Sequence, residues 1–511
     1  MTQQTGGARE PKRRVFSPRA ALVLAGVLIV AALGIAIALD VGGVRDRLFG
    51  GGTPPIHRMA ILTVENLSKD PAQAYLAQGL TNLLILDMNR IIPVIAASSV
   101  AKYKQAPKPI PDIGRELNVD AILQCGVLRS GDRVRLTATL THAPTNRRLW
   151  EQTYDRDLRD LRKLRDEVTL AVARQAGVRL TGQQETLLAS RGPVNPAAQD
   201  ALMRGMWGGN PAKTEESIKQ AIQLDPTYAE AYDFLAQTYS MRAMYPTRVA
   251  PKVIYPKVEE TARKAISLDP SLPLSHRALA TVALEYDWNF AEAEKEFKVA
   301  LQIAPNGPAA HHMYAHFLIT MGRMPEGEAE SRLVIEQDPM SAQPLSCVSW
   351  HGVAAADHDI IERRSAQAFK LGAPDQLARL ALAWSYQLRG RHADAIPEFQ
   401  KAVVGWQNAV FPTASLGHAY AVAGQAAAAR EVLDGLLARA KTEYVSAYEI
   451  AAVYAGLGDR DRAFEWLDKA YDERSTMLVY FRMDPRIWSL RSDPRFQALL
   501  GRMNFPVNAR Q

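Results

Sequence analysis

Small and aromatic residues recur at a fixed interval along the C-terminal half of the chain. Three sets of residues share a spacing of 34: Gly390, Gly424 and Gly458; Tyr386, Tyr420 and Tyr454; Ala395, Ala429 and Ala463. Gly322 falls in the same register two periods earlier. This period predicts stacked helix–turn–helix units, in which glycine ends the first helix because it tolerates a left-handed conformation.

Each predicted unit pairs two helices through small residues that let the helix axes approach. In one unit the first helix carries Leu416, Gly417 and Tyr420, and the second carries Ala429 followed by Leu433. This pattern resembles the tetratricopeptide repeat. On that resemblance we expect an all-α superhelix of about eight repeats over residues 197–475. The alternative is a helical bundle without regular stacking.

The upstream repeats are less regular. Helices are expected to stop before four prolines that are 44, 35 and 34 residues apart, namely Pro226, Pro270, Pro305 and Pro339. The extra length in the second repeat falls in Ala243–Ile254, which predicts a loop. The fifth repeat has Ala356 where the turn glycine is expected.

Residues 57–190 lack the repeat and predict an α/β domain with a small mixed sheet. Apolar runs at 59–64, 91–97 and 121–128 indicate buried strands. Alternation of apolar with Arg and Thr side chains from Val134 to Leu140 predicts a half-exposed strand, with residues 147–154 as its antiparallel neighbour. Helices are expected over 72–88, 113–117 and 158–176.

This segment resembles the TolB amino-terminal-like domain that precedes tetratricopeptide repeats in many bacterial proteins. The residues that carry the resemblance are Glu65–Pro71, Gln78–Thr81, Ile113–Leu117, Leu149–Arg156 and, after the repeats, Leu490–Phe496. The chain departs from the family at Thr63-Val64, where Pro-Phe is usual, and at Asn82–Leu84, where the family is more acidic. Family members are often fused to a winged-helix or nucleotide cyclase domain, and we expect neither here.

An apolar run without charge, Ala20–Leu39, is long enough as a helix to span a bilayer core of about 30 Å. Five basic residues precede it and favour a cytoplasmic N-terminus. We expect a cytoplasmic tail at 1–19, a transmembrane helix at 20–39, a flexible tether at 40–56 and a periplasmic remainder, in a bacterial inner-membrane protein. The alternative is a signal peptide cleaved after Ala36-Ile37-Ala38.

The net charge of +7 is concentrated at the N-terminus. Residues 1–19 carry +4 and the other 492 residues carry +3, so the charge pattern does not indicate nucleic-acid binding. The two cysteines, Cys125 and Cys347, lie in different predicted domains and do not have metal-ligand spacing.

The chain has no P-loop, dinucleotide fingerprint, H-E-x-x-H motif or nucleophile elbow. Ser99 and Lys102 match the spacing of a nucleophilic serine motif, but its partner motifs are absent. His312 and His316 lie one helical turn apart, as metal ligands can, but no third ligand follows at a suitable spacing. We therefore expect no enzymatic activity, no cofactor and no metal.

A stacked array presents a concave groove lined by the first helix of each unit. In the register of the resemblance, the residues that point into this groove are His312, His316, Trp384, Gln387, His418 and Tyr448. Exposed aromatic residues there would suit peptide binding. The alternative is that these side chains pack against neighbouring helices.

Residues 476–511 are expected to cap the last repeat. Asp493 can cap a helix that begins at Pro494 and buries Phe496, Leu499, Leu500 and Met503. Together these features predict a membrane-anchored scaffold that binds a protein or peptide partner. The alternative is a ligand-sensing or regulatory subunit of a signalling system related to the cyclase-linked or winged-helix-linked family members. The sequence identifies neither the partner nor the oligomeric state.

Overall fold

The computed structural model describes residues 55–68, 70–182, 192–207, 210–244, 249–372 and 375–506. The chain divides into two units, Met1–Pro55 and Ile56–Gln511. The tail and the transmembrane helix expected at the N-terminus lie outside the described residues, as does most of the tether. Within the described ranges, no helix combines the length and the apolar character needed to cross a membrane.

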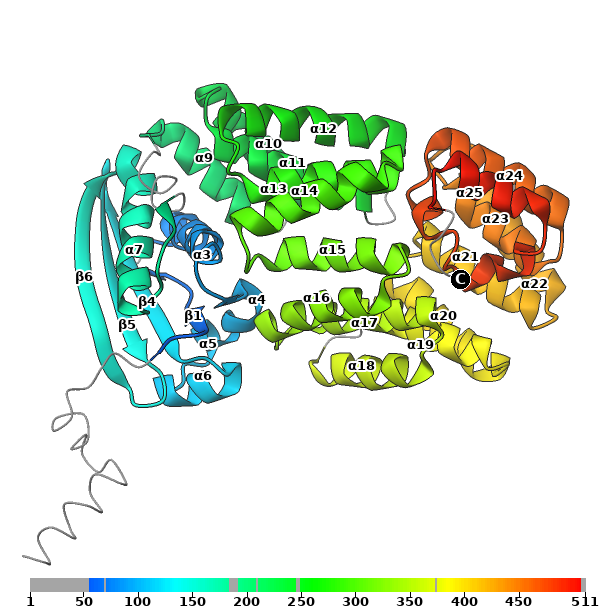
Figure 1. Cartoon of the computed structure of the whole chain (residues 1–511), viewed down its shortest axis with the longest axis horizontal. Helices are drawn as coiled ribbons and strands as arrows, with labels where there is room; N and C mark the ends of the chain where they lie inside the picture. The colour runs from blue at the N-terminus through cyan, green and yellow to red at the C-terminus, as the bar shows by residue number, and fades with distance from the viewer. Residues whose placement is uncertain are drawn as a thin grey trace, which may run out of the picture. The chain divides into compact units, whose positions relative to one another are not determined.

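The second unit begins with the small mixed sheet that the sequence predicts. Its strands are β1 (Met59–Ile61), β2 (Glu65–Asn66), β3 (Val94–Ile95), β4 (Ala121–Ser130), β5 (Arg133–His142) and β6 (Arg147–Asp157). β1 pairs in parallel with both β3 and β4, and β4, β5 and β6 pair antiparallel in sequence order (Figure 1). β2 pairs in parallel with β4.

Alternation along the buried strands gives the sheet two apolar faces. Met59 and Ile61 of β1 face the core that contains α3 (Ala74–Met88) and α7 (Leu161–Gln175), whereas Ala60 faces a second core on the other side. That second core contains residues of the short helices α4 (Ala97–Val100), α5 (Lys102–Gln105) and α6 (Ile110–Leu117). Period-two side-chain direction thus lets one short strand serve both layers.

Helices then follow one another in antiparallel pairs, as in a tetratricopeptide-repeat superhelix. Among the described residues the pairs are α9 (Pro196–Trp207) with α10 (Pro211–Leu224), α11 (Ala229–Met244) with α12 (Pro251–Leu268), α13 (Pro273–Val282) and η4 (Ala283–Asp287) with α14 (Phe290–Ile303), α15 (Pro308–Thr320) with α16 (Met324–Gln337), α17 (Ala342–Ala355) with α18 (His358–Lys370), α19 (Gln376–Leu388) with α20 (His392–Gly405), α21 (Val410–Val422) with α22 (Ala426–Arg439), and α23 (Ala447–Gly456) with α24 (Arg460–Glu473). The part of the expected loop that follows Ala250 is helical, because α12 begins at Pro251.

The structure confirms that the glycines spaced 34 residues apart adopt the left-handed backbone conformation that the turn needs. Gly322, Gly390, Gly424 and Gly458 all have φ between 73° and 77°, in the left-handed region that glycine enters without cost. Ala356 adopts the same region at φ 52°, and so does Trp288 at φ 56°, one period before Gly322. The turn therefore keeps its conformation through six successive positions, although two of them are not glycine.

The small residues of the second helices also have the predicted role. Ala395, Ala429 and Ala463 have no solvent exposure, and Ala395 and Ala463 belong to apolar clusters between helices. Gly327 lies in the same register, two periods before Ala395. A Cβ atom at Gly327 would lie 2.5 Å from Cγ1 of Ile319, so the two helices of that repeat are in contact there.

A buried ion network joins the α/β domain to the first repeats. The Arg165 guanidinium on α7 donates to Asp87 on α3 at 2.9 Å and to Glu230 on α11 at 2.8 Å, and its side chain is 1% exposed. Close by, α9 packs on α3 at Gly79, where a Cβ atom would lie 2.9 Å from the Met203 side chain. Because a buried charge must keep its partners, these contacts hold the domain and the repeats together.

A second contact joins the α/β domain to the end of α16. Ser99 donates to the Asp338 carboxylate at 2.7 Å and accepts from the amide of Met340 at 2.9 Å. Ala96 donates its amide to the carbonyl of Gln337 at 2.7 Å. Ser99 is fully buried in this contact. Its match to a nucleophile motif is therefore explained by a structural role.

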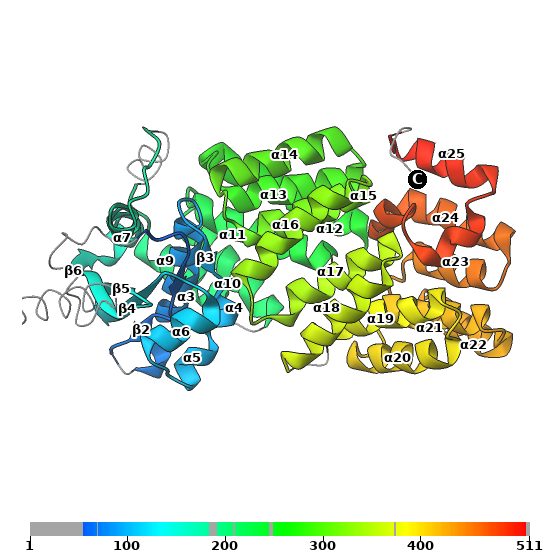
Figure 2. The same ribbon diagram turned by 60° about the horizontal axis from the view of Figure 1, so that its bottom comes forward.

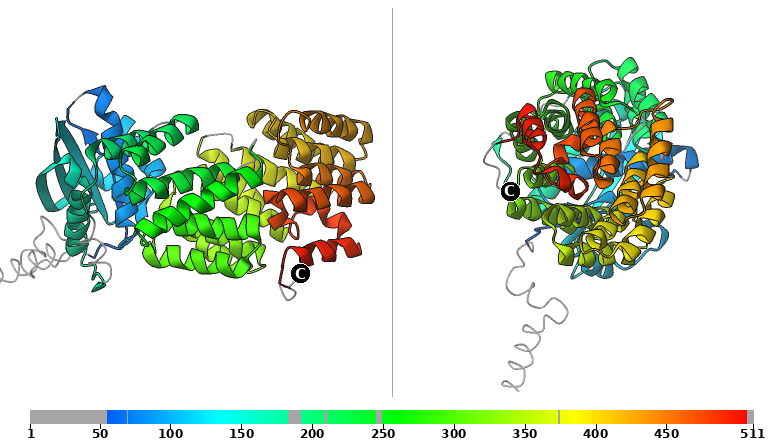
Figure 3. Two further views of the ribbon diagram at one scale, coloured as in Figure 1. Left: turned by 90° about the horizontal axis from the view of Figure 1, so that it is seen from above. Right: turned by 90° about the vertical axis from the view of Figure 1, so that its right-hand side faces the viewer.

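The C-terminal segment caps the last repeat and also returns to the early ones (Figure 2, Figure 3). It consists of η5 (Thr476–Tyr480), η6 (Pro485–Leu490) and α25 (Pro494–Arg502), and Asp493 caps α25 as expected. The tilted rings of Phe505 and Phe290 pack with their centroids 4.8 Å apart, and Arg482 donates to the carbonyl of Thr320 at 3.0 Å. The segment thus bridges the last repeat and the third and fourth repeats.

Replacing Ala356 with Gly should stabilise the protein by about 1 kcal/mol, because it removes the steric cost of a left-handed alanine. The Ala356 side chain is exposed, so no buried methyl group is lost. Chemical denaturation measures the change. As a matched control, Gly390→Ala should cost a similar amount, since a Cβ atom there meets nothing within 4 Å and only the backbone is strained. Equal stability of all three proteins would contradict the turn analysis.

Candidate functional site

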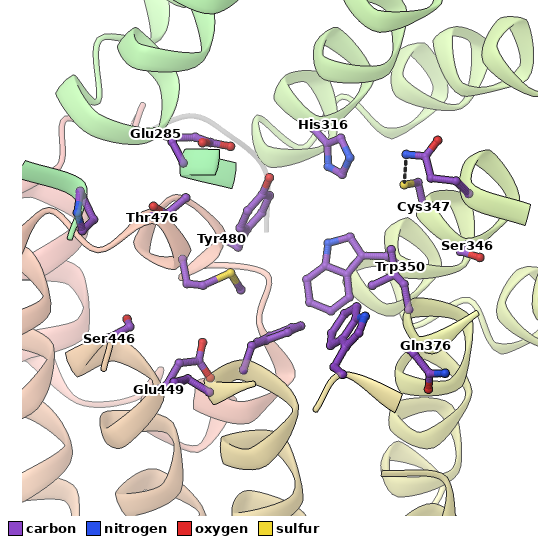
Figure 4. A pocket seen from close by; sticks show the side chains of 18 of the residues that line it. Glu285, His316, Ser346, Cys347, Trp350, Gln376, Ser446, Glu449, Thr476 and Tyr480 are labelled. Atoms are coloured by element: carbon purple, nitrogen blue, oxygen red, sulfur yellow. Dashed lines mark hydrogen bonds between the residues drawn. The ribbon is translucent and has the colours of Figure 1, made fainter. Parts of the chain in front are cut away.

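The repeats and the C-terminal segment line a partly open cavity of about 350 Å³. Its walls come from η4, from the first helices of the later repeats (α15, α17, α19 and α21), from the start of α23 and from η5. Figure 4 shows His316, Cys347 and Trp350 on one wall, with Glu285, Thr476 and Tyr480 facing them. The segment that contains Tyr480 therefore supplies the wall opposite α15 and α17.

The lining combines aromatic rings with carboxyl groups. The ring of Trp350 lies 5.9 Å from that of Phe411 and 6.4 Å from that of Tyr480, between centroids. Glu285, Asp375 and Glu449 supply carboxyl groups, and none of the described lining residues is Lys or Arg. The cavity therefore favours an apolar or aromatic group that carries a positive charge or hydrogen-bond donors.

Glu285 is the lining carboxyl group whose ionisation changes near neutral pH. It is 2% exposed, and burial raises its pKa to about 7, although the hydroxyl of Tyr255 donates to it at 2.5 Å and Arg277 favours its charged form. Burial dominates because a carboxylate loses its hydration there. At neutral pH the cavity therefore holds a carboxyl group that can gain or release a proton.

A cluster of nitrogen and sulfur ligands lies in the wall formed by α15 and α17. His312, His316 and Cys347 each offer one ligand atom within 4.8 Å of the others, and His312 Nε2 lies 3.9 Å from Cys347 Sγ. The expectation that the histidine pair lacks a third ligand is wrong. The next repeat supplies one 35 residues after His312, on the adjacent first helix.

Burial keeps this cluster neutral. It lowers the pKa of His312 to about 4, and it lowers the pKa of His316 well below the ordinary value, with His351 and His312 adding to the effect. Burial also raises the pKa of the Cys347 thiol to about 12. His351 Nε2 lies 3.4 Å from His316 Nδ1, so a fourth side chain adjoins the cluster.

His311 points away from the cluster. Its Nδ1 atom forms a hydrogen bond with Glu330, and its Nε2 atom lies 2.9 Å from the carbonyl oxygen of Pro305. Neither partner lines the cavity. His276 repeats this arrangement one unit earlier, with Glu296 at 2.6 Å and the carbonyl of Pro270 at 3.0 Å. These two histidines therefore join successive helices within the array.

Of the six residues predicted to line the groove, only His312 and His316 reach the cavity. Trp384 and Tyr448 have no exposure, and His418 and Gln387 are 4% and 8% exposed. Gln387 Nε2 lies 3.3 Å from His418 Nδ1, between neighbouring first helices. The expectation that these four side chains line an open groove is wrong.

The chain itself occupies the space that these residues face. The Arg486 guanidinium lies 5.9 Å from the Trp384 ring and 5.7 Å from the Tyr448 ring, and the Tyr448 hydroxyl donates to Asp484 at 2.9 Å. Burial, reinforced by the positive charge of Arg486, lowers the pKa of His418 to about 4. The sequence register identified the inward side of the helices, but it did not reveal that η6 packs against it.

Three groups of lining residues escaped the sequence analysis. Trp350 lies 34 residues before Trp384 and 34 after His316, so the repeat register was a usable signal for it. Tyr480 and Met477 come from η5, which has no counterpart in the repeats, and no periodic signal marks them. Glu285 lies in the π-helical turn η4, which interrupts the regular α-helix.

Comparison with known proteins gives one match to a curated sequence. A stretch of 244 residues, 46% of this chain, is 32% identical to the protein named "Putative adenylate cyclase 3" of Rhizobium meliloti (strain 1021). The match spans 41% of that protein, which is less than half of its length. No protein-family model matches the chain.

Solved structures with stacked helices are similar over part of the chain. A tetratricopeptide repeat protein of Parabacteroides merdae aligns with 50% of this chain and 98% of its own, at 14% identity and a TM-score of 0.35. PilF of Pseudomonas aeruginosa aligns with 48% of this chain and 99% of its own, at 18% identity and a TM-score of 0.29. Human IFIT1 aligns with 61% and 76%, at 15% identity and a TM-score of 0.39. Function therefore has to be inferred from this chain's own side chains.

Replacing Glu285 with Gln should change how stability depends on pH. The folded-state pKa of about 7 lies above the ordinary value of 4.5, so the stabilising contribution is complete below pH 4.5 and is lost as the pH rises through 7. The variant should lack this loss and gain up to roughly 3 kcal/mol over wild type between those limits. Denaturation curves at several pH values measure it.

The control for this prediction is Glu328→Gln, which removes an exposed carboxyl group on α16. Its stability should follow the wild-type pH profile. Parallel profiles for wild type and Glu285→Gln would show that the Glu285 carboxyl group ionises as an ordinary surface group does.

Proposed function

We propose that this chain is a membrane-anchored scaffold of the bacterial inner membrane whose repeats bind a protein partner in the periplasm. The observation that carries the proposal is the cavity, to which η4, four first helices, the start of α23 and the C-terminal segment all contribute side chains. A lining assembled from so many repeats depends on the whole array, as expected of a binding surface in a repeat protein. The proposal includes no catalytic activity.

The cavity limits what the partner can insert. A volume of about 350 Å³ is at the lower end of typical ligand pockets. It accommodates a short segment and not a long extended peptide. The aromatic rings of Trp350, Phe411 and Tyr480 suit an apolar or aromatic side chain, and Glu285 suits an amino or guanidinium group. We infer that the partner presents a short segment of this mixed chemistry.

A second function has one observation in its favour. The similarity to a protein named as an adenylate cyclase favours a regulatory subunit of a signalling system, in which the α/β domain binds a small ligand. The ion network around Arg165 would then transmit the bound state to the repeats, because it connects α3 and α7 to α11. A small ligand retained by the α/β domain would favour this function over the scaffold.

Partner retention tests the scaffold proposal. The full chain, extracted from membranes in detergent after crosslinking, should retain a partner that mass spectrometry identifies. Trp350→Ala should reduce the retained amount by at least about tenfold, as removal of a central aromatic anchor does. Trp207→Ala is the matched control, because Trp207 is 54% exposed on α9 and does not line the cavity. Circular dichroism verifies that both variants fold, and equal retention by both would rule out the cavity as the binding site.

Membrane topology is the second testable part. If Ala20–Leu39 spans the membrane with the basic residues inside, alkaline phosphatase fused after Pro55 should be active, because this enzyme folds only after export. Fusion after Arg19 gives the cytoplasmic control, which should be inactive. An inactive fusion at Pro55 would refute the proposed location, and release of an active fusion from the membrane would indicate a cleaved signal peptide.

A further inference from the structure

The ligand cluster in the cavity wall has the composition of a metal site. His312 and His316 lie one turn apart on α15, and Cys347 and His351 lie one turn apart on α17. Each residue of the second pair follows its counterpart by 35 positions. Two adjacent first helices therefore present facing pairs of nitrogen and sulfur ligands, with the second pair one residue past the 34-residue register.

We propose that His312, His316 and Cys347 bind a late first-row divalent cation, with Zn2+ as the reference metal. Imidazole and thiolate are the ligands that zinc prefers, and an i, i+4 histidine pair on one helix is a common half of such a site. The assignment goes beyond partner binding and does not depend on it.

The distances require little movement of the side chains. Zinc bonds of about 2.0 Å to nitrogen and 2.3 Å to sulfur place tetrahedral ligand atoms about 3.3 Å (two nitrogens) or about 3.5 Å (nitrogen and sulfur) apart. His312 Nε2 and Cys347 Sγ are 3.9 Å apart, and the three ligand atoms lie within 4.8 Å of one another. Contraction by at most about 1.5 Å through side-chain rotation would complete the set. Since α15 and α17 pack within the array, the backbone is already in place.

A chain of hydrogen bonds fixes which nitrogen of His316 is free. The Ser331 hydroxyl donates to the carbonyl of Gly327 at 2.8 Å, so its oxygen accepts at 3.4 Å from Nδ1–H of His351. Nε2 of His351 then accepts from Nδ1–H of His316 at 3.4 Å. This leaves the lone pair on Nε2 of His316. Such outer partners commonly orient metal-binding histidines, and His351 fits this role.

The site opens on the cavity. His312, His316 and Cys347 all line the cavity, whereas His351 lies behind them. Three protein ligands leave a fourth coordination position that water or a donor atom of a bound molecule can fill, as in catalytic zinc sites. The Cys347 thiol loses its proton as the metal–sulfur bond forms, so binding releases a proton and strengthens as the pH rises.

Metal binding by the purified full chain tests the proposal. After treatment with a chelator, the protein should bind about one Zn2+ per chain. Co2+ in its place should give the near-ultraviolet thiolate-to-cobalt band and the intense visible bands of a four-coordinate site. Cys347→Ser should abolish the thiolate band, and His312→Gln should weaken binding at least about tenfold. His351→Gln should weaken binding by about 10–100-fold and retain the thiolate band.

Matched controls use the same residue types elsewhere. Cys125→Ser removes the buried cysteine of β4, and His57→Gln removes an exposed histidine. Both should bind metal as wild type does. A measurement on the wild-type chain avoids the question of variant folding: Zn2+ should slow the reaction of Cys347 with a thiol reagent and leave Cys125 unaffected. Absence of metal binding, binding unchanged in Cys347→Ser, or equal protection of both thiols would overturn the assignment.

Discussion

The Arg486 guanidinium has no exposure to solvent, and a charge in that position must be neutralised by neighbouring groups. It donates to Glu449 on α23 at 2.5 Å and to Asp484 in its own segment at 2.7 Å. Burial opposes ionisation of Asp484, but Arg486 more than compensates and lowers the pKa of that carboxyl group. Glu449 belongs to the last repeat, whereas Asp484 and Arg486 belong to the C-terminal segment. As long as Arg486 is charged and buried, the segment must therefore lie against the last repeat.

The position of η5 and the form of the cavity follow from this constraint. Arg486 packs among the rings of Trp384, Phe411 and Tyr448 and so holds η6 in place. The residues of η5, which precede η6, then line the cavity. Tyr480 is thereby held opposite Trp350, with the ring centroids 6.4 Å apart. Removing one member of a buried ion pair typically costs about 3–5 kcal/mol. The same interaction therefore supports both the stability of the cap and the closed wall of the cavity.

Local rules were sufficient to predict most of the fold. The turn needs a residue such as Gly424 at one position, and the contact between the two helices needs a small residue such as Ala429 at another. Both requirements recur in several repeats, so their spacing is visible in the sequence. Trp288 occupies the same turn without being glycine, and composition therefore did not reveal it. The candidate site was harder to predict, because Cys347 and His312 come together only when one repeat is stacked on the next. A search along one helix does not bring them together, and adding the 34-residue period to His312 and His316 gives Ser346 and Trp350, one residue short of Cys347 and His351. The position of Arg486 depends on packing by a segment without periodicity, which no register predicts.

The C-terminal segment follows, in the sequence, every helix that it contacts. During synthesis the repeats emerge before it, and until it packs against them the cavity lacks the side chains that η5 supplies. At that stage Trp350 and His316 lack the ring of Tyr480 as a neighbour. Once Arg486 is buried, a molecule in the cavity shares it with Tyr480 and Met477. A ligand that binds before the segment packs therefore meets a different set of side chains from one that binds afterwards.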